Sequence, residues 1–180
     1  MNVGRVYWQG AAPHGPQTLG LGPDLFSKSG CLATALAMAA ERIFKKDVPP
    51  SLVNRLCTKG GAFNGDRLIL DKACGIFGMK CDDTDGIAPL GDLALAMTRK
   101  QLAFIHVDLD DDGKGQHHIL AIAEPMPRVF VCLDPSLARP VVLHGAMQDA
   151  YEFWGKGDKA VLKHYRVIKV RPVYAANPTT

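Results

Sequence analysis

The sequence has no long run of one charge and no long apolar segment. Its 180 residues carry a formal net charge of +3, and the basic residues are scattered, so the composition does not indicate nucleic-acid binding. The apolar stretches fall far short of the roughly 20 residues that a membrane-spanning helix needs. The first residues lack the charged start and the apolar centre of a signal peptide. We therefore expect no nucleic-acid or membrane partner, and a protein that is cytoplasmic, or released or packaged without a signal peptide.

Cysteine is present, but not at the spacing of a metal site or a disulfide framework. The chain has an odd number of cysteines and no Cys-x-x-Cys pair. Free thiols are typical of a reducing compartment. We expect no structural metal and no cofactor. The five cysteines are Cys31, Cys57, Cys74, Cys81 and Cys132.

The order of the expected elements predicts an α+β fold. Hydrophobic residues make up 47% of the chain, which is enough for one compact domain over residues 1–172, followed by a flexible tail at 173–180. Up to residue 100, apolar residues recur mostly at helical spacing. After it, short apolar runs with a period of two indicate strands. The expected helices are 31–46, one opened by Pro49–Ser51 and stopped at Gly60, a short one carrying Leu68 to Cys74, 89–100 and 146–154. The expected strands are 6–9, 79–81, 102–107, 118–123, 129–133, 140–143 and 161–170.

The stretch from Ser27 to Arg42 is predicted to form the central helix of the fold. A turn of small polar residues ends at Gly30, Cys31 follows, and an alanine-rich helix begins. Cys31 then lies in the first turn, where free backbone N–H groups and the helix dipole stabilise a thiolate. This helix itself carries few bulky side chains, so other elements can pack closely around it. The sequence predicts a buried helix with a nucleophilic sulfur at its tip, although most lone cysteines are structural.

A histidine and an aspartate follow at positions that can serve this cysteine. His118 opens an apolar strand, and Asp134 closes the next one. A symmetric hairpin centred on Met126 would place the two side by side, so that the carboxylate orients the imidazole. His117 points to the other face of the strand, and a one-residue bulge would select it instead of His118.

These motifs together resemble the papain-like cysteine peptidases. The likeness is to the bacteriocin-leader-processing peptidases and their phage and bacterial relatives. It rests on Ser-Gly-Cys opening a helix, on His-His-Ile-Leu-Ala-Ile, on Leu-Asp-Pro, and on a segment with a glutamine (Tyr7–Gln9) followed by Leu19-Gly20. The resemblance covers residues 7–136. It implies a papain-like fold, in which the cysteine-bearing helix packs on a C-terminal antiparallel sheet.

The same resemblance implies roles for four residues. Cys31 would be the nucleophile, His118 the general base and acid, and Asp134 the orienting carboxylate. These relatives also use a glutamine upstream of the cysteine as an oxyanion donor. Six residues before Cys31 this chain has Leu25, so Gln9 is the candidate donor and Gln17 a weaker one.

We expect a thiol hydrolase that cleaves a peptide or isopeptide bond. The resemblance implies peptidoglycan peptides or the maturation of another protein as substrate classes. The alternative is a catalytically silent structural or binding module of a phage particle or secretion apparatus, which the leucine at position 25 motivates. A third reading is a transferase that uses the same three residues.

The acidic segment Asp108–Gly113 matches the first half of an EF-hand loop. The twelfth position of that loop should be a bidentate glutamate and is Ile119. An acidic turn between two strands is the simpler interpretation.

Overall fold

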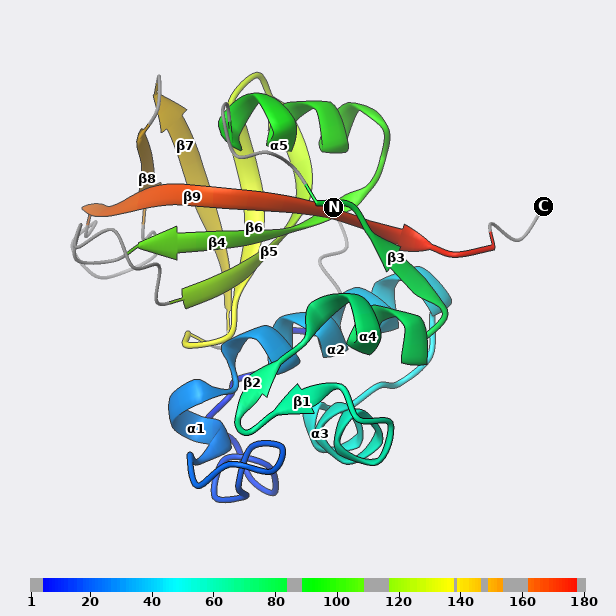
Figure 1. Cartoon of the computed structure of the whole chain (residues 1–180). Coiled ribbons are helices and arrows are strands. Elements are labelled where there is room, and N and C mark those ends of the chain that lie inside the picture. The colour runs from blue at the N-terminus through cyan, green and yellow to red at the C-terminus, as the bar shows by residue number, and fades with distance from the viewer. Residues whose placement is uncertain are drawn as a thin grey trace.

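The fold combines a helical half with an antiparallel sheet, as the order of the sequence elements predicts (Figure 1). The computed structural model describes residues 5–83, 89–108, 117–137, 139–146, 149–153 and 162–177. The helices are α1 (Phe26–Ser29), α2 (Cys31–Phe44), α3 (Pro50–Lys59), α4 (Leu70–Ile76) and α5 (Pro89–Thr98). The strands are β1 (Phe63–Asn64), β2 (Arg67–Leu68), β3 (Met79–Cys81), β4 (Leu102–Asp108), β5 (His117–Met126), β6 (Val129–Asp134), β7 (Arg139–Ala146), β8 (Asp149–Phe153) and β9 (Leu162–Ala175).

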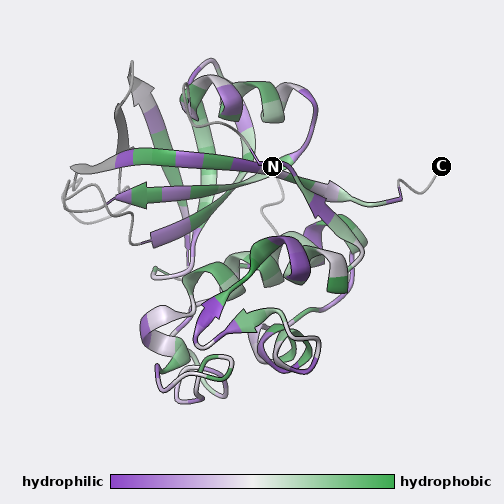
Figure 2. Ribbon diagram, viewed as in Figure 1, coloured by the Kyte–Doolittle hydropathy of each residue, from purple (hydrophilic) through white to green (hydrophobic). Residues whose placement is uncertain are grey.

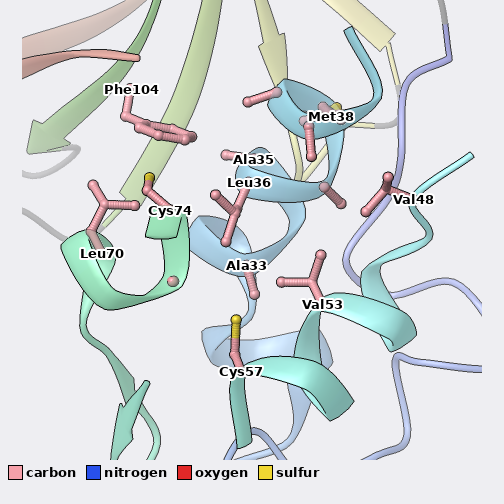
Figure 3. Close-up of a cluster of buried hydrophobic side chains, with 14 of the residues drawn as sticks. Ala33, Ala35, Leu36, Met38, Val48, Val53, Cys57, Leu70, Cys74 and Phe104 are labelled. Carbon is pink, nitrogen blue, oxygen red and sulfur yellow. The ribbon is translucent and has the colours of Figure 1, made fainter. Parts of the chain in front are cut away.

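Helix α2 is the centre of the helical half. Its alanines let α3 and the sheet approach closely, and most of its residues are buried. The helix ends where Lys45 adopts the left-handed conformation (φ 55°) and its N–H returns to the Glu41 carbonyl. Pro50 opens α3 at a position where a missing N–H costs nothing. Figure 3 shows Val53 and Cys57 of α3, with Leu70 and Cys74 of α4, around the small side chains of α2.

The sheet closes on itself. Its strands follow the order β3-β9-β4-β5-β6-β7-β8, and a further β8–β9 pairing joins the ends of the series β9 to β8. Six strands therefore form a closed antiparallel barrel, and β3 extends it by pairing with the end of β9. Figure 2 shows purple and green segments following one another along β9, the period-two pattern of a strand with two different faces.

Alternate residues of the central strands supply two separate cores. Ile105 and Ile119 join a cluster inside the barrel, where Leu90 and Leu93 of α5 also lie. Phe104 and Leu120 face outward and pack with α2 in the helical-side cluster. β4 and β5 thus connect the two clusters, and the site described below lies where these strands meet the start of α2.

Three sequence expectations are corrected here. Residues 149–153 form strand β8 and not part of a helix over 146–154, because they pair with both β7 and β9. The expected tail begins too early, since Val173 to Ala175 pair with β3. Residues 6–9 form no strand; they run as an irregular segment in which Tyr7 bonds to Glu41 of α2.

In the part of the chain that the structure describes, no helix combines the length and the apolar character needed to cross a bilayer.

Candidate functional site

Cys31 occupies the first position of α2, directly after Gly30. The short helix α1 ends one residue earlier, and the Gly30 N–H donates to the Phe26 carbonyl. No side chain caps α2, so the N–H groups of its first turn have no intrahelical acceptor. The thiol is 8% exposed. The structure therefore places the sulfur where the sequence predicts it, at the tip of a buried helix.

Both histidines at the start of β5 reach this sulfur, but they have different second partners. The Nδ1 atom of His118 lies 3.5 Å from Cys31 Sγ. His117 also lies close enough to the thiol to lower its pKa, and its Nε2 lies 2.7 Å from Asp134 Oδ1. The expectation that Asp134 lies beside His118 is therefore wrong. The structure places the carboxylate behind His117.

The register of the β5–β6 hairpin explains this correction. The turn pairs Met126 with Val129, so it is centred one to two residues later than a symmetric hairpin about Met126. Register shifts follow along the strands, and the ladder reaches the pairing Leu120–Leu133. Continued by one residue, that register opposes Asp134 to Ile119 and places it on the face of His117. Such irregularities are those by which a bulge re-aims side chains near a site.

Asp134 is fully buried and satisfied by several donors. Its Oδ1 accepts hydrogen bonds from both the backbone N–H and the hydroxyl of Ser136, each at 2.7 Å, besides its contact with His117. Burial opposes the charged form of Asp134, but the bonds from His117 and Ser136 prevail and lower the pKa of its carboxyl. Asp134 is therefore an ionised partner for the imidazole.

These contacts favour the charged forms of both the thiol and the imidazole. Burial acts to raise the pKa of Cys31, but hydrogen bonds and charge from His117 and His118 lower it from 9.0 to about 6. Burial likewise acts to lower the pKa of His117, but Asp134 and Cys31 raise it from 6.5 to about 10. At neutral pH the arrangement is therefore a thiolate next to an imidazolium. Such a pair supplies a nucleophile and a proton donor within reach of one reacting group.

Gln9 connects α1, which precedes Cys31, with the segment that follows Asp134 at the end of β6. Its backbone N–H donates to the carbonyl of Pro135, next to Asp134, and its Nε2 donates to the carbonyl of Ser27 in α1, both at 2.9 Å. The side chain is 9% exposed, and its Oε1 has no partner among the described residues. One of the two hydrogens on Nε2 suffices for Ser27, which leaves the second for a ligand.

The two other positions considered for an oxyanion donor do not meet these conditions. Gln17 is exposed and lines a separate hollow with Pro13, Pro49 and Arg55. Leu25 is 38% exposed and has no side-chain donor. Gln9 is thus the glutamine that the structure brings to the elements of the site.

A cavity of about 700 Å³ opens over Cys31. His117, His118 and Phe104 contribute from the sheet side, and Leu32 and Leu68 from the helical half. His106 also lines it, and its ring stacks on that of His118 with 4.3 Å between centroids and 6° between planes. His106 was not identified from the sequence. Its one signal was a polar residue in an otherwise apolar strand.

The described residues contain no group of three or more His, Cys, Asp or Glu side chains arranged to hold a metal ion. The EF-hand-like half-motif falls largely on residues 109–113, which lie outside the described residues. Asp108, at its start, is buried at the end of β4.

Comparison of the chain with protein-family models, with curated proteins and with solved structures finds no match. The functional argument therefore rests on the residues of this chain and their geometry.

Proposed function

We propose that this protein is a papain-like cysteine hydrolase that cleaves a peptide or isopeptide bond with Cys31, His117 and Asp134. The observation that carries the proposal is the ordered series from the sulfur through the imidazole of His117 to the ionised carboxylate. A thiol on a helix N-terminus, a histidine beside it and a carboxylate behind that histidine satisfy the requirements of an activated nucleophile.

The roles follow from the protonation states. The Cys31 thiolate attacks the carbonyl carbon of the scissile bond, and the His117 imidazolium gives its proton to the leaving amine. Water then attacks the thioester, with neutral His117 as the general base that takes the proton of the water. Asp134 holds Nε2 of His117, which leaves Nδ1 for the reacting groups. The backbone N–H of Cys31 and the second N–H of Gln9 Nε2 are the proposed donors to the oxyanion.

His118 has a different role in this scheme. It contacts the sulfur through Nδ1 and stacks on His106. Its Nδ1 contact adds a second hydrogen bond that stabilises the thiolate before attack. The assignment of the general base thereby moves from His118 to His117.

Peptides, including peptidoglycan stem peptides, and a protein precursor are the substrate classes that we propose to test first. A catalytically silent binding module, as in a phage or secretion particle, is the second candidate. The engagement of Gln9 Nε2 by Ser27 favours it, since a donor that stays on Ser27 does not serve an oxyanion.

The test combines thiol labelling with hydrolysis assays. We expect iodoacetamide at pH 7 to modify Cys31 well before the fully buried Cys57 and Cys74, because only Cys31 has a lowered pKa among the cysteines with a resolved shift. Mass spectrometry of peptides reads the order of labelling. Peptide mixtures and purified muropeptides, analysed by liquid chromatography and mass spectrometry, read hydrolysis.

The matched variants are Cys31→Ser and Cys81→Ser. We expect the first to abolish hydrolysis and the second to leave it unchanged, since Cys81 is the other cysteine that is not fully buried and lies against Asp71. Equal labelling of Cys31 and Cys57 would contradict the activated thiol. Rapid labelling without hydrolysis of any peptide would favour the silent module.

A further inference from the structure

A row of basic side chains crosses the sheet toward Cys31. The register pairs Lys169 of β9 with His106 of β4, and His106 with His118 of β5. All three line the cavity over Cys31, and His118 ends the row at the sulfur. Two strand spacings separate Lys169 from His118, about 10 Å.

The cavity as a whole also carries more cations than carboxylates. The charged residues among the described lining are Lys28, Arg67, Lys169 and Arg171 against Asp24 and Asp66. They come from both walls, because Lys28 and Arg67 belong to the helical half and the other two cations to β9. A partly enclosed cavity lined by one predominant sign of charge concentrates ligands of the other sign.

The carboxylates near these cations lie partly outside the cavity. Arg171 pairs with Asp71 at 2.6 Å and with Asp83 at 3.7 Å, and Lys169 also pairs with Asp83. These two acids are 69% and 64% exposed and lie outside the lining. Ion pairs with such exposed carboxylates are weak, so a ligand carboxylate can compete for both cations. Within the lining, Asp24 is bound by the Ser29 hydroxyl. Arg67 is the exposed first residue of β2, and it lines the cavity, where its guanidinium is available to a ligand.

We propose that the cavity binds an anionic peptide, with a substrate carboxylate lying along the row from His118 to Lys169 and toward Arg67. This rests on the proposed function, whose substrate it specifies. Since an extended chain spans about 3.3–3.6 Å per residue, 10 Å corresponds to about three residues. The acidic group is therefore a side chain or a free carboxylate within about three residues of the scissile bond.

The test compares two reagents that alkylate the same sulfur and differ in charge. Iodoacetate carries a carboxylate and iodoacetamide does not; in both, the S–C bond forms and iodide leaves. We measure the ratio of the two rates at Cys31 in the intact protein at pH 7 and low salt, with glutathione as the reference thiol. We expect the ratio of the iodoacetate rate to the iodoacetamide rate to be higher at Cys31 than at glutathione. In roughly 0.5 M sodium chloride it should fall toward the glutathione value.

Variants separate the cavity cations from the imidazolium next to the sulfur. We expect Lys169→Gln to lower the ratio about twofold, for a charge roughly 10 Å away in a water-like medium. Arg67→Gln, on the opposite wall of the cavity, should also lower the ratio, and the double variant should lower it further than either single variant. Lys46→Gln is the matched control. Lys46 follows the other end of α2, about 20 Å from Cys31 at 1.5 Å per residue, and the ratio should not change.

Each outcome decides one of the two proposals. A ratio in the double variant equal to that of the unmodified protein overturns the anionic substrate and leaves the cysteine hydrolase intact. Slow labelling of Cys31 by both reagents overturns the hydrolase, while the ratio still reports the charge preference of the cavity. Arg67→Gln alone, at the exposed start of the short strand β2, decides the case if Lys169→Gln fails to fold, and circular dichroism checks folding.

Discussion

At the scale of single residues, the two histidines of the site differ in their second partner. His117 has an ionised carboxylate behind it, whereas His118 has the parallel ring of His106 beside it. Both lower the pKa of Cys31, and contact with Asp134 and Cys31 raises the pKa of His117. In the proposed mechanism, His117 transfers the proton, and His118 stabilises the Cys31 thiolate.

The pH dependence follows from the two pKa values. The pKa of Cys31 is about 6, so the thiolate, and with it the alkylation rate, is lost as the pH falls through 6. The pKa of His117 is about 10, so the proton donor is lost as the pH rises through 10. We expect hydrolysis to be bell-shaped between these limits. Alkylation should instead reach a plateau and stay there above pH 10.

Replacement of His118 tests this division of roles. We expect His118→Asn to raise the pKa of Cys31 by about one unit, the value of one hydrogen bond to a charged group, and to retain hydrolysis above that pKa. His117→Asn should lower hydrolysis by about 10²–10⁴-fold at every pH. Rates of alkylation and of hydrolysis, measured from about pH 4 to about pH 11, give the pKa of Cys31 and the loss of activity. The reverse order of the two effects would return the general base to His118.

Gln9 is tested against Gln17, the other candidate donor. We expect Gln9→Ala to reduce kcat by about 10²–10³-fold, because one oxyanion donor is lost. Alkylation of Cys31 forms no oxyanion, so its rate should remain unchanged. Gln17→Ala should affect neither, since Gln17 lines a separate hollow. Unchanged hydrolysis in Gln9→Ala would show that Nε2 stays on Ser27.

The sequence predicted the three residue types of the site but not their pairing. Cys31 was predictable, because a glycine and an alanine-rich run mark a helix start at that point. His117 was not selected over His118, because the choice depends on the strand register. The ladder of β5 and β6 shifts twice between the turn and Leu120, and nothing in the local residue pattern fixes where such irregularities occur.

At the scale of elements, Gly30 fixes how α1 leads into α2. A Cβ atom at this position would lie 2.4 Å from the Phe26 carbonyl oxygen and 2.4 Å from the Phe26 ring. The backbone of Gly30 itself is unstrained, with φ of −83°, so the need for glycine here comes from close approach alone. The residue is part of what holds the sulfur at the helix tip.

We therefore expect Gly30→Ala to lower the free energy of unfolding by about 1–3 kcal/mol, the range for overpacking, and to slow the alkylation of Cys31. Gly75→Ala is the matched control. A Cβ atom there would meet nothing within 4 Å, and Gly75 lies inside α4, so alanine should raise the free energy of unfolding by about 0.5–1 kcal/mol. Urea unfolding measures both. Equal stability of the two variants would contradict a destabilising contact between a Cβ atom at position 30 and Phe26.

Strand and helix prediction succeeded where pattern and flanking residues agreed. The strand expected at 102–107 is β4, and the helix opened by Pro49–Ser51 is α3. Residues 146–154 were assigned the wrong type, because tertiary pairing with β7 and β9 sets the conformation of 149–153. Barrel closure was not predicted for the same reason, since it depends on a pairing between segments that no local pattern identifies.

At the scale of the whole molecule, β4 and β5 bind the two cores together. Each strand sends alternate side chains into the barrel and toward α2, so neither core is complete without them. The order of helices and then strands predicted an α+β fold, and the structure confirms that class. The papain-like identity of the fold remains our proposal. Shared strands imply that the helical half and the barrel depend on each other for stability.

The expected result is a single cooperative unfolding transition for both halves. We expect Leu36→Ala, in the helical-side core, and Ile105→Ala, inside the barrel, each to lower the free energy of unfolding by about 2–5 kcal/mol, since both side chains are fully buried. Hydrogen exchange followed by mass spectrometry across a urea series reports peptides from α2 and β6 separately. In either variant both peptides should lose protection at the same urea concentration, because removal of either core exposes strands that the other requires. Separate midpoints for α2 and β6 would show that the expected single domain over residues 1–172 consists of two independently stable parts, with Cys31 on one and His117 on the other.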